Sequence, residues 1–260
     1  SDLGKAPILW TRSRPASRNG PNDLRNKARE TLKRENMKKL NLLLGGAAFV
    51  AMTSPALAAG LSANGAITTN YVWRGVSQSS NDPAVQGGFD YDLGNGFAVG
   101  TWASSISWYG DSPLELDVYG SYTGAITNEL GWTVGAIGYL YPNADSSLPT
   151  PNFWEPYVGL NWTVDTVALS GKVYYSDDNL GSKTWYYTGG VTIPLDAWLS
   201  FSANYGHYTF DPGTDYTDWN LGLAATWKFL TFSATYVDND LSGSIGKSRV
   251  VGMVSVKVSE

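Results

Sequence analysis

The feature that most constrains this chain is a regular series of extended segments separated by turns of two alternating lengths. From Ala59 onward, apolar and polar side chains alternate with a period of two residues, and no segment longer than a few residues has helical spacing. Most of these segments are about nine to twelve residues long, the length that a tilted strand needs to cross a bilayer. We predict twelve strands, over residues 62–77, 83–93, 97–108, 114–127, 130–140, 153–164, 167–176, 183–193, 197–208, 217–227, 230–237 and 248–258.

The links between the predicted strands alternate strictly in length. Short turns on the periplasmic side and longer loops outside are typical of outer-membrane barrels, and an even number of strands places both ends of the barrel on the periplasmic side. The pattern therefore predicts an all-β fold, a single twelve-stranded antiparallel transmembrane β-barrel with short periplasmic turns and longer extracellular loops. The short links are LGNG, TNEL, VDT, PLDA and KFL, and the longer ones are SSNDPA, WYGDSP, YPNADSSLPTPN, SDDNLGSK, FDPGTDYT and DNDLSGSIGK.

Side-chain alternation within the strands supports the same architecture. Glu115 and Asp117 alternate with Leu116 and Val118, so one face of that strand is acidic and the other apolar. In the segment 97–108, aromatic and polar side chains share one face, and its inside and outside stay unassigned. Trp and Tyr residues near strand ends predict the aromatic girdles of a membrane barrel, and ordinary aromatic packing between strands is the alternative reading. These residues are Trp108, Tyr109, Trp154, Trp162, Trp198, Trp219 and Trp227.

A basic and apolar leader precedes the predicted barrel. MKKLNLLLGGAAFVAMTSPALAA begins at Met37 with two lysines, continues with a short apolar run and ends in the small-x-small pattern of Ala56–Ala58, as in a secretory signal peptide. Residues 37–58 are therefore predicted to be the signal peptide, and residues 59–260 the mature barrel. Residues 1–36 lack apolar periodicity and precede this complete signal, so we expect a non-native, unstructured upstream extension; a functional basic extension is the alternative.

Charge and cysteine content narrow the classes of function. The residues after Ala58 contain seven Lys and Arg and 19 Asp and Glu, a formal charge of −12, so nucleic acid is not an expected partner. The chain has no Cys, which excludes a disulfide scaffold and thiol chemistry and fits an exported protein. Charged residues make up only 16 %, which suits strands that face lipid but also a secreted β-sandwich.

Five segments resemble motifs of one known family. The resemblance is to the TorF family of Gram-negative outer-membrane porins, which are expected to form small barrels, and it spans essentially all of residues 59–260. Its first motif is the most specific, and the resemblance implies a channel or porin-like role. The segments are NYVWRGVSQ at 70–78, GFAVGTWAS at 96–104, ELDVYG at 115–120, EPYVGL at 155–160 and YVD at 236–238.

Polar side chains on the inward face of the strands are candidates for lining a pore. Strand direction places Arg74 and Arg249 in the outer half of neighbouring strands, as one basic wall, and the acidic candidates elsewhere on the circumference. We predict an eyelet of opposed charges that sorts small polar solutes, because charged walls set pore selectivity. Twelve strands imply a narrow pore, and the alternative is that the opposite charges pair and plug the lumen. The pore-lining candidates are Arg74, Glu115, Asp117, Glu155, Lys172, Asp218 and Arg249.

Other functions stay open at this point. A few small barrels modify lipids with a Ser–His pair, but His207, the single histidine, is predicted on the lipid side, and nothing in the sequence places Ser202 or Ser233 beside it. We therefore expect no enzyme, but a passive, narrow channel for small polar solutes or ions. The main alternative is a plugged structural or ligand-binding barrel without transport activity, and a third class is a soluble periplasmic β-protein.

The expected partners follow from this location. We expect an integral protein of the outer membrane, exported by its signal peptide, that contacts outer-membrane lipid and lipopolysaccharide, small polar solutes and the outer-membrane assembly machinery. No cofactor or metal is expected, because the chain has one His, no Cys and loop acids without EF-hand spacing.

Overall fold

The structure is a computed structural model of the 260-residue chain, and it describes residues 60–107, 112–144, 151–243 and 246–259. The predicted upstream extension and signal peptide lie outside the described residues, as do Trp108 and Tyr109. No described segment forms a helix long and apolar enough to cross a membrane.

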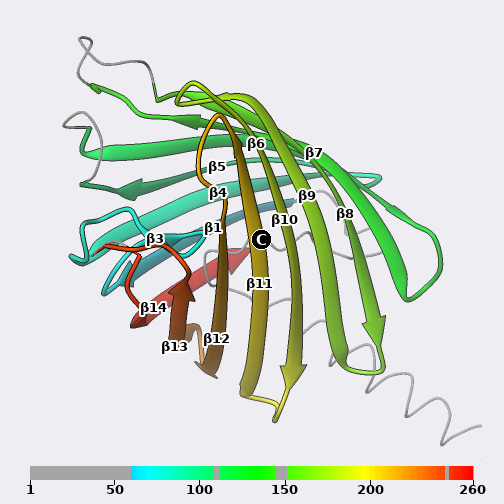
Figure 1. Cartoon of the computed structure of the whole chain (residues 1–260). Coiled ribbons are helices and arrows are strands. Elements are labelled where there is room, and N and C mark those ends of the chain that lie inside the picture. The colour runs from blue at the N-terminus through cyan, green and yellow to red at the C-terminus, as the bar shows by residue number, and fades with distance from the viewer. Residues whose placement is uncertain (1–59, 108–111, 145–150, 244–245, 260) are drawn as a thin grey trace, which may run out of the picture.

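Within the described residues, twelve antiparallel strands form a closed barrel (Figure 1). Successive strands pair with each other, and the first strand closes the ring by pairing with the second and the last. The predicted twelve-stranded barrel is confirmed, and all strand ends except that of the first strand agree within three residues. The barrel strands are β1 (Gly60–Thr68), β4 (Ala84–Gly94), β5 (Phe97–Ser105), β6 (Leu114–Ala125), β7 (Leu130–Leu140), β8 (Phe153–Val164), β9 (Val167–Asn179), β10 (Ser182–Pro194), β11 (Leu199–Asp211), β12 (Tyr216–Trp227), β13 (Leu230–Asn239) and β14 (Arg249–Ser259).

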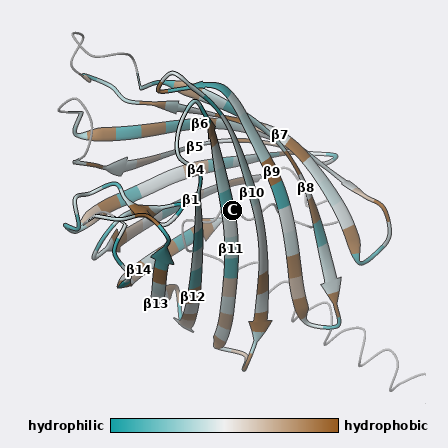
Figure 2. Cartoon of the chain, viewed as in Figure 1, coloured by the Kyte–Doolittle hydropathy of each residue, from teal (hydrophilic) through white to brown (hydrophobic). Residues whose placement is uncertain are grey.

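Side chains alternate between an apolar outer face and a largely polar or tyrosine-lined inner face along the strands. Figure 2 shows the corresponding alternation of hydrophobic and hydrophilic residues along the ribbons. In β8, Glu155 and Tyr157 are buried inside the barrel, whereas Trp154, Val158 and Leu160 are exposed on its outside. Because successive side chains of a strand point to opposite faces, this alternation produces a continuous apolar belt around the barrel. Residues of the belt include Leu61, Ile67, Val85, Phe89, Val99, Val158, Leu160, Leu221, Leu223, Val250 and Val254.

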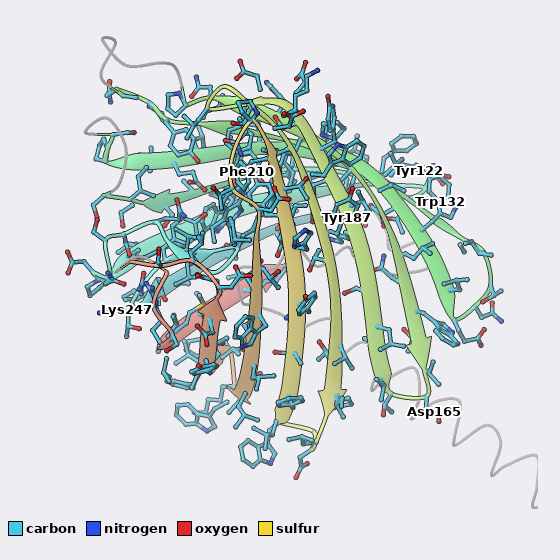
Figure 3. The ribbon with its side chains drawn as sticks, viewed as in Figure 1. Tyr122, Trp132, Asp165, Tyr187, Phe210 and Lys247 are labelled. Atoms are coloured by element: carbon cyan, nitrogen blue, oxygen red, sulfur yellow. The ribbon has the colours of Figure 1, made fainter. Side chains whose placement is uncertain are left out.

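Exposed aromatic side chains lie near both ends of the strands, above and below the apolar belt. One band lies where the links are short and the other where the links are long, in agreement with the predicted aromatic enrichment at strand ends. In Figure 3, Tyr122 and Trp132 lie side by side near the first band, and their ring centres are 5.4 Å apart. The first band contains Phe97, Trp162, Trp198, Trp227 and Phe229, and the second Trp154, Trp185, Tyr187, Tyr205 and Tyr236.

The two ends of the barrel differ in the length of their links. At the turn end, tight links such as those at Asn95, Asp165 and Lys228 use residues with positive φ, as the primed turns of β-hairpins require. The opposite, loop end carries the longer links, and Figure 3 labels Asp165 at the turn end and Lys247 at the loop end. One predicted long link, SDDNLGSK, is instead paired strand: β9 and β10 continue to the two-residue turn Leu180–Gly181.

The prediction for the first strand is wrong beyond Thr68. Residues 69–83, which we call the inward hairpin, leave the wall and carry the short strands β2 (Val72–Trp73) and β3 (Val76–Ser77). Residues 70–79 of the inward hairpin are all buried or half-buried, and residues 69 and 80–83 are exposed. The hairpin is not hydrogen-bonded as a strand of the barrel. The first loop of the barrel therefore fills the lumen at the loop end.

Candidate functional site

The tip of the inward hairpin is a tight turn at Arg74 and Gly75. Both residues have positive φ, 46° and 79°, which fits a two-residue hairpin turn. A Cβ atom on Gly75 would lie 2.7 Å from the Asp218 Cβ atom and 3.1 Å from Asn239, so only glycine fits here. The turn therefore fixes the direction in which the Arg74 side chain points.

The guanidinium group of Arg74 lies at the centre of the site. Its Nη1 and Nη2 atoms donate hydrogen bonds to the two carboxylate oxygens of Glu155 in β8, at 2.8 and 2.5 Å, as a bidentate ion pair. The two side chains are only 5 % and 1 % exposed. Four aromatic rings surround the cation, with ring centres 4.2 Å (Trp73), 4.1 Å (Tyr186), 4.6 Å (Tyr208) and 5.1 Å (Tyr174) from the Cζ atom of Arg74.

Two further carboxylates lie beside Glu155 on the same wall. Glu115 accepts a hydrogen bond from the Tyr71 hydroxyl at 2.7 Å, and Glu155 accepts a third one, from the Tyr139 hydroxyl, at 3.1 Å. Asp117 is the cross-strand neighbour of Tyr139; it is buried, and its Oδ1 atom has no hydrogen-bond partner. Burial, with the nearby carboxylates, raises the pKa of Tyr71, which lies outside the barrel strands, so this phenol stays a neutral donor.

The opposite wall holds the hairpin tip from the other side. The side-chain amide of Asn239 donates a hydrogen bond to the Gly75 carbonyl oxygen at 2.6 Å. Asp218, buried next to it, accepts a hydrogen bond from the Tyr186 hydroxyl at 3.0 Å. The tip is therefore clamped between β8 on one side and β12 and β13 on the other, across the lumen.

The predicted basic wall of Arg74 and Arg249 is wrong. Arg74 does not belong to a barrel strand but reaches across to Glu155, whereas Arg249 starts β14 at the rim. There its Nε atom donates to the Lys247 carbonyl oxygen at 2.7 Å, and its Nη1 atom bonds Asn81. The tight turn at Gly75 separates the two arginines, because it directs the hairpin into the barrel rather than along the wall.

Five of the seven predicted candidates gather around the inward hairpin: Arg74, Glu115, Asp117, Glu155 and Asp218. Lys172 is also buried and faces inward, but it lies deeper, with its Nζ atom 5.6 Å from the ring centre of Tyr157. Arg249 stays at the rim.

The sequence analysis missed the aromatic residues of the lumen. Tyr71 packs edge-to-face on Trp102 at 5.3 Å, which assigns Trp102 and Ser104 to the inner face of β5, the face that the sequence left open. The position of each tyrosine in its strand was a signal that could have identified them, because residues two apart in a strand face the same side. The tyrosines share their strand faces with the inward carboxylates, not with the outer belt. The inward tyrosines are Tyr139, Tyr157, Tyr174, Tyr186, Tyr208 and Tyr216.

The half of the lumen nearest the turn end has a different lining. Its inner wall consists mainly of small polar side chains, several of them partly exposed to solvent. Asn204, for example, donates to the Asn220 side chain at 3.0 Å and is only half-buried. The lumen is therefore polar at this end and partly accessible to solvent, although Thr133, Ser200 and Thr231 on the same inner face are buried. Residues of this lining are Asn64, Ser170, Ser202, Asn204, Asn220, Ser233, Thr235 and Ser255.

His207 lies away from the lumen, on the outward face of β11. Its Nδ1 atom is 3.2 Å from the Thr217 hydroxyl oxygen, an outer-face partner on the neighbouring strand. Among the described residues, no group of three or more His, Asp or Glu side chains is arranged to hold a metal ion.

The architecture and the inner wall together define the class: a closed twelve-stranded antiparallel barrel of the porin type, apolar outside and charged inside. The chain belongs to the family described as bacterial protein of unknown function (Gcw_chp), whose model matches residues 52–258. The resemblance to the TorF family stays a prediction. A search of curated proteins found no significant match.

Solved outer-membrane porins share the fold. The NanC porin aligns with a TM-score of 0.53 and 14 % identity, over 75 % of this chain and 98 % of that one. The KdgM porin aligns with a TM-score of 0.53 and 11 % identity, over 76 % and 97 %, and its complex with disordered oligogalacturonate gives a TM-score of 0.51 and 11 % identity, over 77 % and 97 %. At these identities the likeness concerns the fold.

Proposed function

We propose that this protein is an integral outer-membrane channel for small polar solutes, held closed in this structure by the inward hairpin. One observation carries the proposal: polar and charged side chains line the lumen along its length, joined by tyrosines at the loop end, but only the loop-end half is filled by a separate segment. The turn-end half keeps a solvent-accessible polar lining. In a purely structural barrel of this size, side chains of the strands would fill the whole lumen. A gated pore instead needs a solvent-accessible lumen that is blocked at one constriction.

The outer surface supports the location. The apolar belt between two aromatic bands has the arrangement of a barrel in lipid, where aromatic side chains lie at both interfaces. In water, so large a contiguous apolar surface would drive association. Residues 37–58 are proposed to direct export as a signal peptide, with the turn end then facing the periplasm.

We expect the mature chain to require detergent for extraction from isolated outer membranes and to migrate faster in unheated than in boiled gel samples. A closed barrel resists unfolding by the gel detergent until it is heated, because its strands leave no open edge. Release by salt or alkaline washing without detergent would contradict the membrane location and favour a soluble periplasmic protein.

The proposed function is tested by the conductance of the refolded protein in planar lipid bilayers. We expect small, infrequent openings, because the Arg74–Glu155 pair and the Asn239 contact hold the hairpin tip on both sides. Glu129→Gln, in an exposed turn-end link, is the matched control and should leave the openings unchanged. An absence of current from the wild type and from a variant without the inward hairpin would favour a plugged barrel without transport.

A further inference from the structure

The residues that bind the Arg74 guanidinium group belong mainly to the barrel wall and not to the hairpin that carries Arg74. Glu155 offers both carboxylate oxygens, and Tyr174, Tyr186 and Tyr208 present their rings to the cation. These four residues, which we call the guanidinium cage, belong to the barrel strands β8–β11 and not to the hairpin. Proteins hold guanidinium groups with a carboxylate that accepts two parallel hydrogen bonds and with aromatic rings whose faces contact the cation.

The wall around the cage holds more carboxyl groups than there are cations to pair with them. Glu115, Asp117, Glu155 and Asp218 are all buried at or beside the hairpin, and they still outnumber the cations when the deeper Lys172 is counted with Arg74. The hydrogen bonds to Glu115 and Asp218 come from neutral tyrosine hydroxyls, which supply no charge.

Asp117 gives a second, independent sign of a missing ligand. Its side chain is 98 % buried on the inner face of β6, yet its Oδ1 atom has no hydrogen-bond partner. A buried carboxylate oxygen without a donor is costly. A cationic N–H donor entering the lumen would satisfy it, next to the Tyr139–Glu155 hydrogen bond.

The hairpin holds Arg74 in the cage as a tethered group. Its two short strands pair only with each other, and Gln78 closes the base by donating to the Tyr71 carbonyl oxygen at 2.7 Å. Removing Arg74 from the cage therefore breaks no strand pairing of the barrel.

We infer that the guanidinium cage is the binding site for a cationic solute that carries a guanidinium group, and that Arg74 occupies this site as an internal competitor. The inference rests on the proposed channel function and names its solute class. A solute with this head group displaces Arg74, pairs with Glu155 and frees the hairpin tip, while the unpartnered Oδ1 atom of Asp117 accepts a hydrogen bond from a further N–H group of the solute.

The test is calorimetric titration of the refolded, detergent-solubilised protein with methylguanidinium. Arg74→Ala is expected to bind it at least tenfold more tightly than the wild type, because a tethered competitor acts at an effective concentration of about millimolar. Lys228→Ala, which removes an exposed cation beside Trp227 at the turn end, is the control and should bind like the wild type. Neutral ethylurea, of similar shape, should not bind Arg74→Ala.

Two further variants separate the outcomes. A variant with residues 69–83 replaced by a two-residue turn also lacks Arg74 and covers the case in which Arg74→Ala does not fold. Adding Glu155→Gln to Arg74→Ala should abolish the gain in affinity. Binding without any channel current would refute the proposed function and leave the inference standing. Current without methylguanidinium binding by either variant, or binding unaffected by Glu155→Gln, would overturn the inference.

Discussion

Replacing residues 69–83 with a two-residue Asn-Gly turn is expected to raise single-channel conductance several-fold and to make the current strongly cation-selective. The replacement is sterically simple, because Thr68 and Ala84 already face each other across β1 and β4, and a tight turn joins such a pair. Removing the inward hairpin takes Arg74 away and leaves four carboxylates, including Glu155 and Asp117, facing an open lumen. Rings of acidic side chains favour cations.

The measurement is conductance and reversal potential in planar bilayers under a potassium chloride gradient. Exchanging the turn Leu180–Gly181 for Asn-Gly is the matched control, since this loop-end turn links two wall strands and does not enter the lumen. An unchanged conductance in the variant would mean that the inward hairpin is not what closes the barrel.

The barrel could be predicted because its determinants are local. Alternation of Glu115 and Asp117 with apolar neighbours fixes which face of β6 is inside, and the tight links fix which strands are neighbours. These signals repeat in every strand, so an error of a residue or two at one end does not change the fold.

The inward hairpin could not be predicted from the same signals. Residues 70–78 have the period-two pattern of a strand, and they follow β1 directly in the sequence. What bends them inward is a turn with a non-glycine residue, Arg74, at positive φ, an uncommon conformation. That turn is stabilised by contacts with Glu155 and Asn239, which are distant in the sequence.

The location of the candidate site was therefore predicted only in part. Parity placed Glu155 and Asp218 inside the barrel, but the partner of each depends on how deep the hairpin reaches. The cage tyrosines lie on the same strand faces as the carboxylates. They were not predicted to face the lumen, because aromatic residues in a membrane barrel are also expected in the exposed girdles. Inward tyrosines on adjacent strands, such as Tyr174, Tyr186 and Tyr208, are a signal for a lumen that binds a cation.

Arg74→Ala is expected to have the largest effect of any single substitution, because it leaves Glu155 buried without its counter-charge. Breaking one partner of a buried ion pair costs about 3–5 kcal/mol in the free energy of unfolding. The substitution also removes the contact that keeps the hairpin tip against β8. If the tip withdraws, water reaches Glu155, so part of the expected loss of stability appears instead as more frequent channel opening.

Stability and conductance must therefore be measured on the same preparations, by urea unfolding in lipid vesicles and by bilayer recording. The double variant Arg74→Ala/Glu155→Gln leaves no charge unpaired between these two residues, and it should recover most of the stability while keeping the more frequent opening. Lys228→Ala at the turn end, which removes an exposed cation over the Trp227 ring, should change the free energy of unfolding by no more than about 1 kcal/mol. A double variant as unstable as Arg74→Ala would show that lost packing of the arginine, rather than the unpaired Glu155 carboxylate, causes the effect.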